Sequence, residues 1–466
     1  MELIWSTVLT VWGWLLDHLL YINLAFSIII IFFQRRDPRS VWTWLLALYF
    51  IPVFGIVFYL LFGQDMKKSR MFRVKEVSDR LNLPVKSQED IIRSDDMPEE
   101  MMDPMSRDFK SLIIYNLETS GSVLTVNNQV QIYTDGQAKF EALRNALRQA
   151  RRFIHIQYYI IKNDELFDSI VPILLDKVRE GVEVRILCDG MGGRFMPKKR
   201  WDQMRSAGIK VGVFFPPFLG WLNLRVNYRN HRKIVVVDGN TGFVGGFNIG
   251  REYISRDPKF GYWRDTHLEI KGEAAISLQI RFALDWNYVT GENLFKEIRY
   301  FGEEAEYARR RLNGQIHAVW PDPDHVNEMV CMQIITSGPD TREPHIRNNY
   351  LELFHKAKHH IYIQTPYFIP DDAIFSSLKI AALSGVDVRL MIPCKPDHPF
   401  VYWATCSYAG ELLDYGARVY VYENGFLHSK GIMIDGRVSC YGTANMDIRS
   451  FELNFEVNAT IYDEEV

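Results

Sequence analysis

Two stretches of this chain, HRKIVVVDG (231–239) and HSKGIMIDG (428–436), share one pattern although almost two hundred residues separate them. Each has a histidine, a lysine two positions later, a run of mostly apolar residues, and then an aspartate followed by a glycine. Side chains two positions apart on a strand leave the same face, so His231 and Lys233 are predicted to point to one place. The pattern therefore brings an imidazole and an ammonium group together, twice.

The second copy places His428 and Lys430 in the same relation. The motif aspartates, Asp238 and Asp435, fall at an odd spacing from the histidines, which puts them on the other face of the strand or in the Asp-Gly turn that follows. We therefore expect the histidine–lysine pairs to carry the chemistry. The two aspartates are included in the catalytic set in a supporting role, either as hydrogen-bonding partners or as plain turn residues.

The match between the two copies continues on both sides of the motif. Asn248 and Asn445 each lie ten residues after the motif aspartate. Upstream, GVEVRILCDG (181–190) matches GVDVRLMIPC (385–394). One histidine–lysine pair on a strand is usually a surface feature, but this many matches at fixed spacing in two places are not explained by chance. The chain therefore contains an internal repeat.

Strand and helix patterns alternate within each copy, which predicts the α/β fold class. In the first copy, 136–152 and 164–181 have the apolar spacing of amphipathic helices, and 153–161 is typical of a strand. Such alternation predicts a mostly parallel or mixed sheet with helices on its faces. We therefore expect two tandem α/β units, 122–300 and 329–466, packed with pseudo-twofold symmetry.

A charged connector at 301–328 is expected to join the two units. The first unit contains a further helix pattern, ISLQIRFALDWNYV (276–289), after its motif. The given chain ends at YDEEV (462–466), where the counterpart of that helix would begin in the second unit. This difference predicts either a shorter second unit or a further C-terminal segment.

Residues 1–64 are more apolar than the rest and are predicted to form a transmembrane hairpin. Its two spans are placed at about 16–33 and 41–62, with QRRDPRS (34–40) as the turn between them. The second segment has 22 residues without a charge, a helix of about 33 Å, which is long enough to cross a bilayer. A signal peptide is disfavoured because the N-terminus lacks a basic region and a second span follows. Residues 65–121 are predicted to be a linker from the membrane to the body.

Composition narrows the class of protein. A hydrophobic content of 47% with 24% charged residues is typical of a folded chain, and the net charge of −3 argues against a nucleic-acid-binding protein. The five cysteines form no CxxC pair and are interpreted as reduced core residues. They favour a catalytic domain on the cytoplasmic side of the membrane. The charges of the loops leave the side open, because basic residues flank both ends of the second span.

The repeated HxKx4D pattern, followed each time by a glycine-containing stretch and an asparagine, resembles the phospholipase D superfamily. The resemblance covers nearly all of 122–466, and with the two N-terminal spans it points to the bacterial cardiolipin synthase family. It implies a multi-pass protein of the cell membrane that transfers a phosphatidyl group between two phosphatidylglycerol molecules, giving cardiolipin and glycerol. It implies no metal and no other cofactor, these membrane lipids as partners, no nucleic acid, and no particular oligomeric state.

The resemblance also implies roles for the two histidines. His231 is the expected nucleophile, which forms a phosphohistidine with the lipid phosphate. His428 is then expected to protonate the departing glycerol and later to deprotonate the incoming hydroxyl group. The opposite assignment stays open, because the two motifs have the same spelling.

The residue types support this chemistry on their own terms. A phosphodiester is anionic and resists attack, so its cleavage needs a nucleophile, positive charge and a proton donor. Histidines supply the first and the last. The residues expected to surround the substrate, as donors to phosphoryl oxygens or as carboxylates that orient the histidines, are Lys233, Lys430, Asn248, Asn445, Asp265 in WRDTH and Glu456 in NFEVN.

Clustered aromatic residues favour a lipid substrate over a nucleic acid. FFPPFLGWLNLRVNYRNHRK (214–233) and PDHPFVYWATCSYAG (396–410) are interpreted either as buried core or as segments at the membrane surface that admit acyl chains. The acidic net charge disfavours a nuclease. A hydrolytic phospholipase D is the main alternative, since water can replace the lipid alcohol at the phosphohistidine. An inactive membrane scaffold is disfavoured because both motifs are complete.

Overall fold

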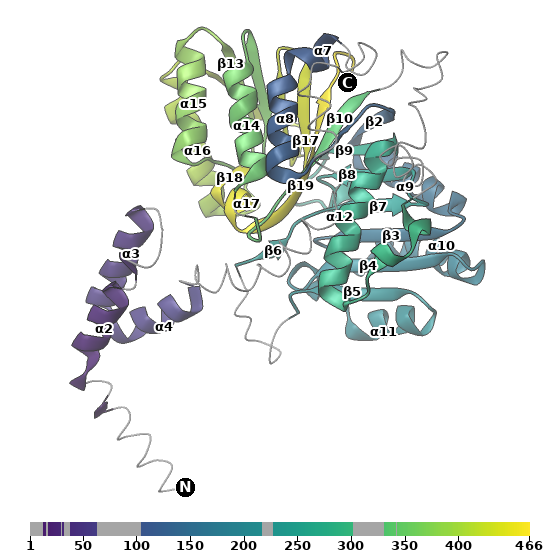
Figure 1. Cartoon of the computed structure of the whole chain (residues 1–466), viewed down its shortest axis with the longest axis horizontal. Coiled ribbons are helices and arrows are strands. Elements are labelled where there is room, and N and C mark those ends of the chain that lie inside the picture. Colours follow the sequence, from purple (N-terminus) through teal and green to yellow (C-terminus); the bar gives the residue numbers. More distant parts are fainter. Residues whose placement is uncertain are drawn as a thin grey trace, which may run out of the picture. The chain divides into compact units, whose positions relative to one another are not determined.

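The computed structural model describes residues 13–14, 17–28, 30–31, 38–62, 104–216, 227–301, 330–341 and 343–466 of the chain. These residues belong to two compact units. One unit contains the N-terminal helices, and the other contains both copies of the motif with the sheets and helices around them (Figure 1). The second unit is called the body.

The N-terminal unit contains short helices, α2 (Leu19–Ile28), α3 (Pro38–Phe50) and α4 (Pro52–Phe62). The span expected at 41–62 is therefore not one continuous helix, because the chain breaks at Ile51. Pro52 explains the break: proline disfavours the helical conformation in the residue before it and has no N–H to donate. Among the described residues, no helix is both long enough and apolar enough to cross a membrane.

The first motif copy lies in an eight-stranded sheet with the order β15-β9-β8-β7-β3-β4-β5, and β2 pairs with β9 beside this path. Its strands are β2 (Asn128–Asp135), β3 (Phe153–Tyr158), β4 (Glu183–Asp189), β5 (Lys210–Phe214), β7 (Ile234–Val237), β8 (Thr241–Gly245), β9 (Trp263–Gly272) and β15 (Phe426–Leu427). Its helices are α9 (Gly136–Gln149), α10 (Glu165–Arg179), α11 (Lys198–Ser206) and α12 (Glu273–Thr290). The sheet is mixed rather than mostly parallel. Strands β3, β4 and β5 are parallel because helices return the chain, whereas β7 and β8 form an antiparallel hairpin.

The second motif copy lies in a nine-stranded sheet with the order β1-β10-β19-β17-β16-β11-β13-β14, and β6 pairs with β19. Its strands are β1 (Leu124–Thr125), β6 (Arg229–Asn230), β10 (Cys331–Ser337), β11 (His360–Gln364), β13 (Asp387–Pro393), β14 (Arg418–Tyr422), β16 (Gly431–Ile434), β17 (Val438–Gly442) and β19 (Asn454–Tyr462). Its helices are α14 (His345–Lys356), α15 (Asp372–Leu383), α16 (Pro399–Leu413) and α17 (Ile448–Glu452), and β12 (Phe368–Ile369) pairs with β18 (Met446–Asp447) beside them. From β19 to β14 the strands repeat the order and directions of β9 to β5.

The local patterns in the first copy predict its elements well. The helices expected at 136–152 and 164–181 are confirmed as α9 and α10, and the strand expected at 153–161 is confirmed as β3. Both helices begin after an aspartate, Asp135 or Asp164, whose side chain accepts a hydrogen bond from the unpaired N–H groups of the first turn. Capping and apolar spacing therefore explain why these segments are helical.

Residues 65–121 were expected to be a linker, but the last part of this segment is folded into the body. Residues 104–120 form α7 (Pro104–Asp108) and α8 (Lys110–Ser120), and the apolar side chains of α8 are buried in the core of the second sheet. Strand β1 then joins the edge of that sheet beside β10. The second half of the body is thus built partly from residues that precede the first copy. The rest of the linker and nearly all of the connector expected at 301–328 lie outside the described residues.

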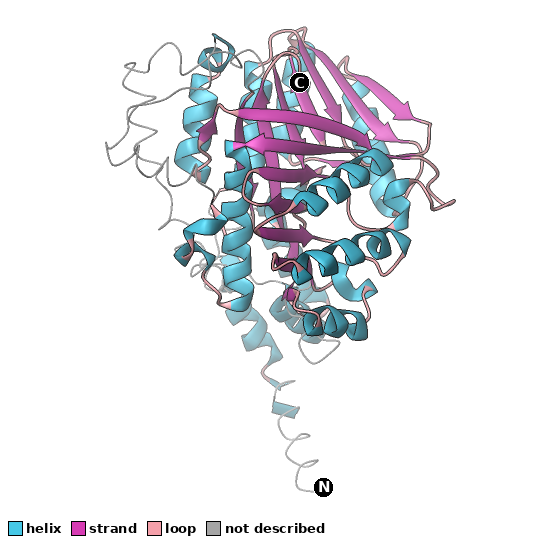
Figure 2. Ribbon diagram, turned by 90° about the vertical axis from the view of Figure 1, so that its right-hand side faces the viewer, coloured by secondary structure: helices cyan, strands magenta, loops and turns pink. Residues whose placement is uncertain are grey.

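Hydrophobic side chains form layers on both faces of each sheet. Figure 2 shows the helices that lie against the strands. Helices α9, α10 and α11 cover the outer face of the first sheet, and α8, α14, α15 and α16 cover that of the second. Between the sheets, Phe282 of α12 packs in one cluster with Val236 of β7 and Met332 of β10. The neighbouring Val235 belongs instead to the outer cluster, as alternation along a strand requires. The helix predicted at 276–289 is therefore an inner element, α12.

Two short strands cross between the halves of the body. Strand β6, directly before His231, pairs with β19 of the second sheet. Strand β15, directly before His428, pairs with β9 of the first sheet. Each motif histidine therefore follows a point where the chain is hydrogen-bonded to the opposite sheet, and this exchange decides which residues surround the imidazoles.

Candidate active site

His231 lies in the connection between β6 and β7, not within a strand as the pattern predicted. Its backbone N–H donates to the carbonyl of Phe455 at 2.9 Å, and its Nδ1 lies 3.0 Å from both carboxylate oxygens of Glu456. Both partners belong to β19, in the other half of the body. Glu456, one of the two expected orienting carboxylates, therefore lies against the histidine of the other copy.

His428 is held in the corresponding way, between β15 and β16. Its backbone N–H donates to the carbonyl of Arg264 at 2.7 Å, and its Nδ1 lies 2.6 Å from Oδ2 of Asp265. These partners belong to β9 of the first sheet. The pairing is thus crossed, because each imidazole takes its carboxylate from the opposite copy. A carboxylate at Nδ1 holds the ring proton there and leaves Nε2 to act on phosphorus or on a proton.

The motif lysines are buried behind their histidines. Nζ of Lys233 donates to the carbonyl of His231 at 2.6 Å, and Nζ of Lys430 donates to the carbonyl of His428 and lies 3.7 Å from Asp265. Burial disfavours charge and lowers the pKa of Lys233 to about 7 and that of Lys430 to about 8. Lys430 also lowers the pKa of Lys233 and of His231. The two motifs are therefore within electrostatic reach of each other.

Burial also lowers the pKa of both motif histidines, to about 4 for His428. Lys430, whose Nζ lies 2.7 Å from Nδ1 of His428, lowers that pKa further, while Asp265 acts in the opposite direction. At His231 the charge of Glu456 opposes the effect of burial. Both imidazoles are therefore largely neutral at pH 7 in the free protein, and the neutral ring is the form with a nucleophilic nitrogen.

The two orienting carboxylates stay ionised although they are buried. Burial raises the pKa of Asp265 and of Glu456, but the facing imidazole and lysine outweigh it and hold each pKa below its usual value. Glu456 also accepts hydrogen bonds from Oγ1 of Thr443 at 2.6 Å and from Nδ2 of Asn454 at 3.1 Å. Gly246 takes the place of Thr443 in the first copy, where a Cβ atom would lie 1.9 Å from Oδ1 of Asp265. Close approach of the carboxylate thus explains this glycine.

The two asparagines expected near the substrate, Asn248 and Asn445, differ in which hydrogen-bonding groups of their amides remain for a ligand. Asn248 is buried, its Nδ2 donates to the hydroxyl of Tyr253 at 2.9 Å, and its Oδ1 accepts the N–H of Ile160 at 3.1 Å. Only one N–H of its amide remains for a ligand. Asn445 is also buried, and within the described part of the chain its Oδ1 has no hydrogen-bond partner. An unpaired amide oxygen suits a hydroxyl group better than a phosphoryl oxygen.

The motif aspartates do not contact the histidines; they lie in the turns that follow the motifs, which is one of the two positions expected for them in a supporting role. Asp238 accepts the backbone N–H groups of residues 151–153 at 2.7 to 2.9 Å, and Asp435 accepts those of residues 358–360 at 2.8 Å. Both have φ of 54° in turns at the far ends of β7 and β16. About 20 Å of extended chain separates Asp238 from His231. The aspartates tie each hairpin to the start of the neighbouring strand.

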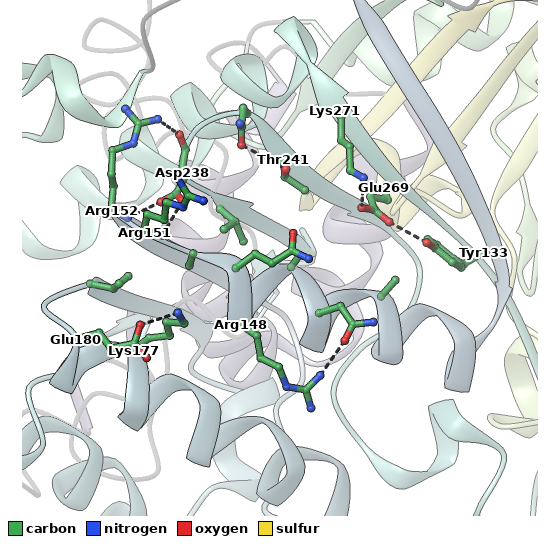
Figure 3. Close-up of a pocket in the computed structure, with 18 residues that line it drawn as sticks. Tyr133, Arg148, Arg151, Arg152, Lys177, Glu180, Asp238, Thr241, Glu269 and Lys271 are labelled. Atoms are coloured by element: carbon green, nitrogen blue, oxygen red, sulfur yellow. Dashed lines mark hydrogen bonds and ion pairs between the residues drawn. The ribbon is translucent and has the colours of Figure 1, made fainter.

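A cavity of about 1100 Å³ lies beside Asp238 at this far edge of the first sheet (Figure 3). Its charged lining includes two pairs that are closed within the protein, Lys177 with Glu180 and Lys271 with Glu269. Its lining includes neither motif histidine and neither motif lysine. The cavity is therefore separate from the catalytic cluster.

Asp238→Ala is expected to reduce stability rather than catalysis. The variant loses three hydrogen bonds to a charged acceptor, so its free energy of unfolding in urea should fall by roughly 1–3 kcal/mol. The kcat of the folded fraction should stay within about threefold of the wild type. Asp202→Ala, which removes an exposed carboxylate from a helix of the same half, is the control that should change neither quantity. Loss of kcat at unchanged stability would instead show that Asp238 takes part in catalysis.

Sequence reasoning missed the groups that pack around the motif. The ring of Tyr159 meets that of His231 edge-on, with 5.1 Å between the centroids. Arg232, between the motif histidine and lysine, forms a buried ion pair of 2.6 Å with Asp285 of α12 and donates to the carbonyl of Glu456. The sequence did contain a signal for this ion pair. Arg232 stands between two predicted site residues, and an arginine buried there needs an acidic partner.

The aromatic segment at 214–233 falls only partly within the described residues. Phe214 and Phe215 are buried and their rings contact that of Phe455, with centroids 5.1 and 6.0 Å away. For these two residues the core interpretation holds. The rest of the apolar cluster, at 217–226, lies outside the described residues.

Residues 143–267 and 350–466 match a protein family described as "Cardiolipin synthase, PLD-like domain", and residues 22–64 match one described as "Phospholipase_D-nuclease N-terminal". The chain is similar to the cardiolipin synthase of Oceanobacillus iheyensis, with 44% identity over 446 residues that cover 96% of this chain and 88% of that protein. The major cardiolipin synthase of Bacillus subtilis is 44% identical over 459 residues, with coverage of 96% and 89%. The cardiolipin synthase of Staphylococcus aureus (strain N315) is 47% identical over 447 residues, with coverage of 96% and 86%.

Among solved structures, the chain is similar to phosphatidylserine synthase from Haemophilus influenzae Rd KW20, with a TM-score of 0.53. The match covers 78% of this chain and 87% of that one at 17% sequence identity, so it concerns the fold. The family matches cover both halves that contribute to the crossed histidine–carboxylate pairs. The chain therefore belongs to the cardiolipin synthase family of the phospholipase D superfamily.

Proposed function

We propose that this protein is a membrane-bound phosphatidyltransferase that condenses two phosphatidylglycerol molecules into cardiolipin and glycerol. Relatives named cardiolipin synthase, 44% to 47% identical over almost the whole chain, support this function. The observation that carries the proposal is the crossed pairing of His231 with Glu456 and of His428 with Asp265. It builds two oriented, neutral imidazoles into one buried cluster, which suits a transfer in which one ring attacks and the other moves protons.

In the first step we assign the attack to His231. Its Nε2 forms a bond to the phosphorus of one phosphatidylglycerol, and the bond from that phosphorus to the glycerol oxygen breaks. His428 gives the departing oxygen a proton, so that free glycerol leaves. The negative charge of the bound phosphodiester raises the pKa of the imidazole beside it, which provides the protonated ring that the free protein lacks.

In the second step the primary hydroxyl group of another phosphatidylglycerol gives its proton to His428 and attacks the phosphorus. The bond from phosphorus to Nε2 of His231 breaks, and cardiolipin is released. Burial lowers the pKa of Lys233 and of Lys430, but the negative charge of the bound phosphodiester raises the pKa of both again, so they supply positive charge near the phosphoryl oxygens in both steps, a role that metal ions have in other phosphoryl-transfer sites. The proposed chemistry therefore needs no metal and no other cofactor, and the unpaired Oδ1 of Asn445 suits the hydroxyl group.

A product assay tests this function directly. The purified full chain is incubated with vesicles of phosphatidylglycerol in the presence of a chelator, and the lipids are separated by chromatography. We expect cardiolipin and glycerol in equal amounts, because each transfer releases one of each. Phosphatidic acid and glycerol without cardiolipin would support the hydrolytic alternative instead. Activity that appears only with an added divalent metal would contradict the mechanism.

We further propose that the N-terminal unit anchors the enzyme in the cell membrane as a two-span hairpin, at about 16–33 and 41–62, with the catalytic body on the cytoplasmic side. The family match at 22–64 supports an anchor, as do large apolar side chains such as those of Tyr49 and Phe50, which are 78% and 72% exposed. Lipid stabilises exposed apolar surface of this kind. None of the five cysteines, all of which belong to the described residues, forms a disulfide bond, which fits a reducing compartment.

A further inference from the structure

An exposed aromatic pair stands at the start of α16. The side chains of Phe400 and Trp403 are 81% and 62% exposed, and their rings meet edge-on with 5.5 Å between centroids. Residues three apart lie on one face of a helix, while the opposite face of α16 is buried in the body. Two large, adjacent and exposed aromatic side chains on a folded domain mark a contact surface.

This end of α16 adjoins the catalytic cluster. Asp397, two residues before the helix, accepts a hydrogen bond from the hydroxyl of Tyr367. Burial lowers the pKa of His428 and of Lys430, and the charge of Asp397 is among those that oppose this effect at both groups. Strand β12, which follows Tyr367, pairs with β18 directly before α17, and Figure 1 shows α16, β18 and α17 together. The aromatic pair therefore stands at the edge of the active site.

Two further exposed apolar residues flank the same site, and each has an arginine beside it. Phe195 is 44% exposed next to Arg194, and Ile448 is 41% exposed next to Arg449. The 3₁₀ turn Gly192–Phe195 lies against Tyr159, because a Cβ atom at Gly192 would be 1.9 Å from the carbonyl oxygen of Tyr159. Burial raises the pKa of the Tyr159 hydroxyl and the charges of both arginines oppose that rise, so arginines from the two copies lie within electrostatic reach of one residue that contacts the catalytic histidine.

We propose that Phe195, Phe400, Trp403 and Ile448, together with Arg194 and Arg449, form a rim that docks the catalytic body onto an anionic phospholipid bilayer. Aromatic rings prefer the boundary of a membrane, and arginines are attracted to its anionic headgroups. The inference rests on the proposed function, because the substrates are then lipids that have to pass from the bilayer into the cluster. The rim adds a second attachment, on the body itself, which turns the site towards the lipid.

Leu413 provides a matched control on the same helix. It is 50% exposed but lies at the other end of α16, about 20 Å from Phe400. Phe400→Asp/Trp403→Asp introduces charge at the end of α16 that is near the active site, whereas Leu413→Asp introduces it at the end that is far from the site. Thermal unfolding of each variant checks that the body stays folded.

The test uses the full chain reconstituted in phosphatidylglycerol bilayers, so that the N-terminal anchor is the same in every variant. Phe400→Asp/Trp403→Asp should lower turnover of the long-chain lipid by about tenfold or more and leave turnover of a soluble short-chain phosphatidylglycerol within about twofold. Leu413→Asp should change neither. Equal loss on both substrates would place the pair in the catalytic machinery, and no loss on either would overturn the docking proposal.

A binding measurement separates this proposal from the proposed reaction. Lipids with a fluorescence-quenching group near the headgroup should quench Trp403, seen as the difference between the wild type and Trp403→Phe, whether or not cardiolipin forms. Arg194→Gln/Arg449→Gln should weaken that quenching in phosphatidylglycerol bilayers and not in phosphatidylcholine bilayers. Absence of quenching would overturn the proposal, as would an oligomer that Phe400→Asp/Trp403→Asp dissociates, since the rim would then bind another copy of the chain.

Discussion

His231→Ala and His428→Ala are each expected to stop cardiolipin formation while the body stays folded. Removal of the nucleophile should lower kcat by about 10⁴-fold or more, because the covalent intermediate can then no longer form on its imidazole. Removal of the group that moves the proton should lower kcat by about 10²–10⁴-fold. His359→Ala, which changes an exposed histidine at the far end of the second sheet, is the control and should keep full activity.

Trapping of the intermediate separates the two histidines. Phosphatidylglycerol with a radiolabelled phosphate is mixed with the enzyme, the reaction is stopped by denaturation, and the labelled peptide is identified. We expect label on His231 in the wild type and in His428→Ala, and none in His231→Ala. Label on His428 would reverse the assignment. Full turnover by either alanine variant would contradict a mechanism based on both rings.

Glu456→Gln and Asp265→Asn are expected to lower kcat by about 10²–10⁴-fold each, although neither carboxylate touches phosphorus in the proposed steps. The amide cannot hold the proton on Nδ1 as the carboxylate does, so the ring loses its preferred tautomer and orientation. Removal of one negative charge also leaves the buried lysines less well compensated. Both effects act on the reacting nitrogen without a change in its contacts to substrate.

Because the pairing is crossed, each carboxylate substitution is expected to change the pKa of the histidine in the other copy. Glu456 raises the pKa of His231, so Glu456→Gln should lower the pKa of His231, measured by NMR with a labelled histidine, and leave that of His428 nearly unchanged. Asp265→Asn should do the reverse. Asp257→Asn, at a half-buried position in a turn of the first half, should shift neither ring. If Glu456→Gln moved His428 instead, each carboxylate would serve its own copy and the crossed arrangement would be wrong.

Local patterns predicted much of the body. Apolar periodicity located α9 and α10, and the repeated order of segments agrees with two sheets that share one strand order. The odd spacing of Asp238 from His231 already indicated that the aspartate is not beside the imidazole. Its hydrogen bonds to residues 151–153 could not be predicted, because they join segments more than eighty residues apart.

The burial of helix α8 also could not be predicted from its local sequence. Its sequence follows a polar stretch, so residues 104–120 were predicted as part of a linker, yet their apolar side chains fill the core of the second sheet. The break at Ile51 was readable, since Pro52 follows it within an otherwise apolar segment. Patterns within a segment report its own backbone preferences, but burial depends on which surface is left uncovered elsewhere in the chain.

The sequence by itself determined the reactive groups of this protein and their duplication, because the spacing of histidine, lysine, aspartate and asparagine can be read along one strand and turn. It also named Asp265 and Glu456 as the carboxylates of interest. Only the tertiary structure decided that each carboxylate serves the histidine of the other copy. The physical reason is the exchange of β6 and β15, whose backbone hydrogen bonds to the opposite sheets fix His231 beside Glu456 and His428 beside Asp265.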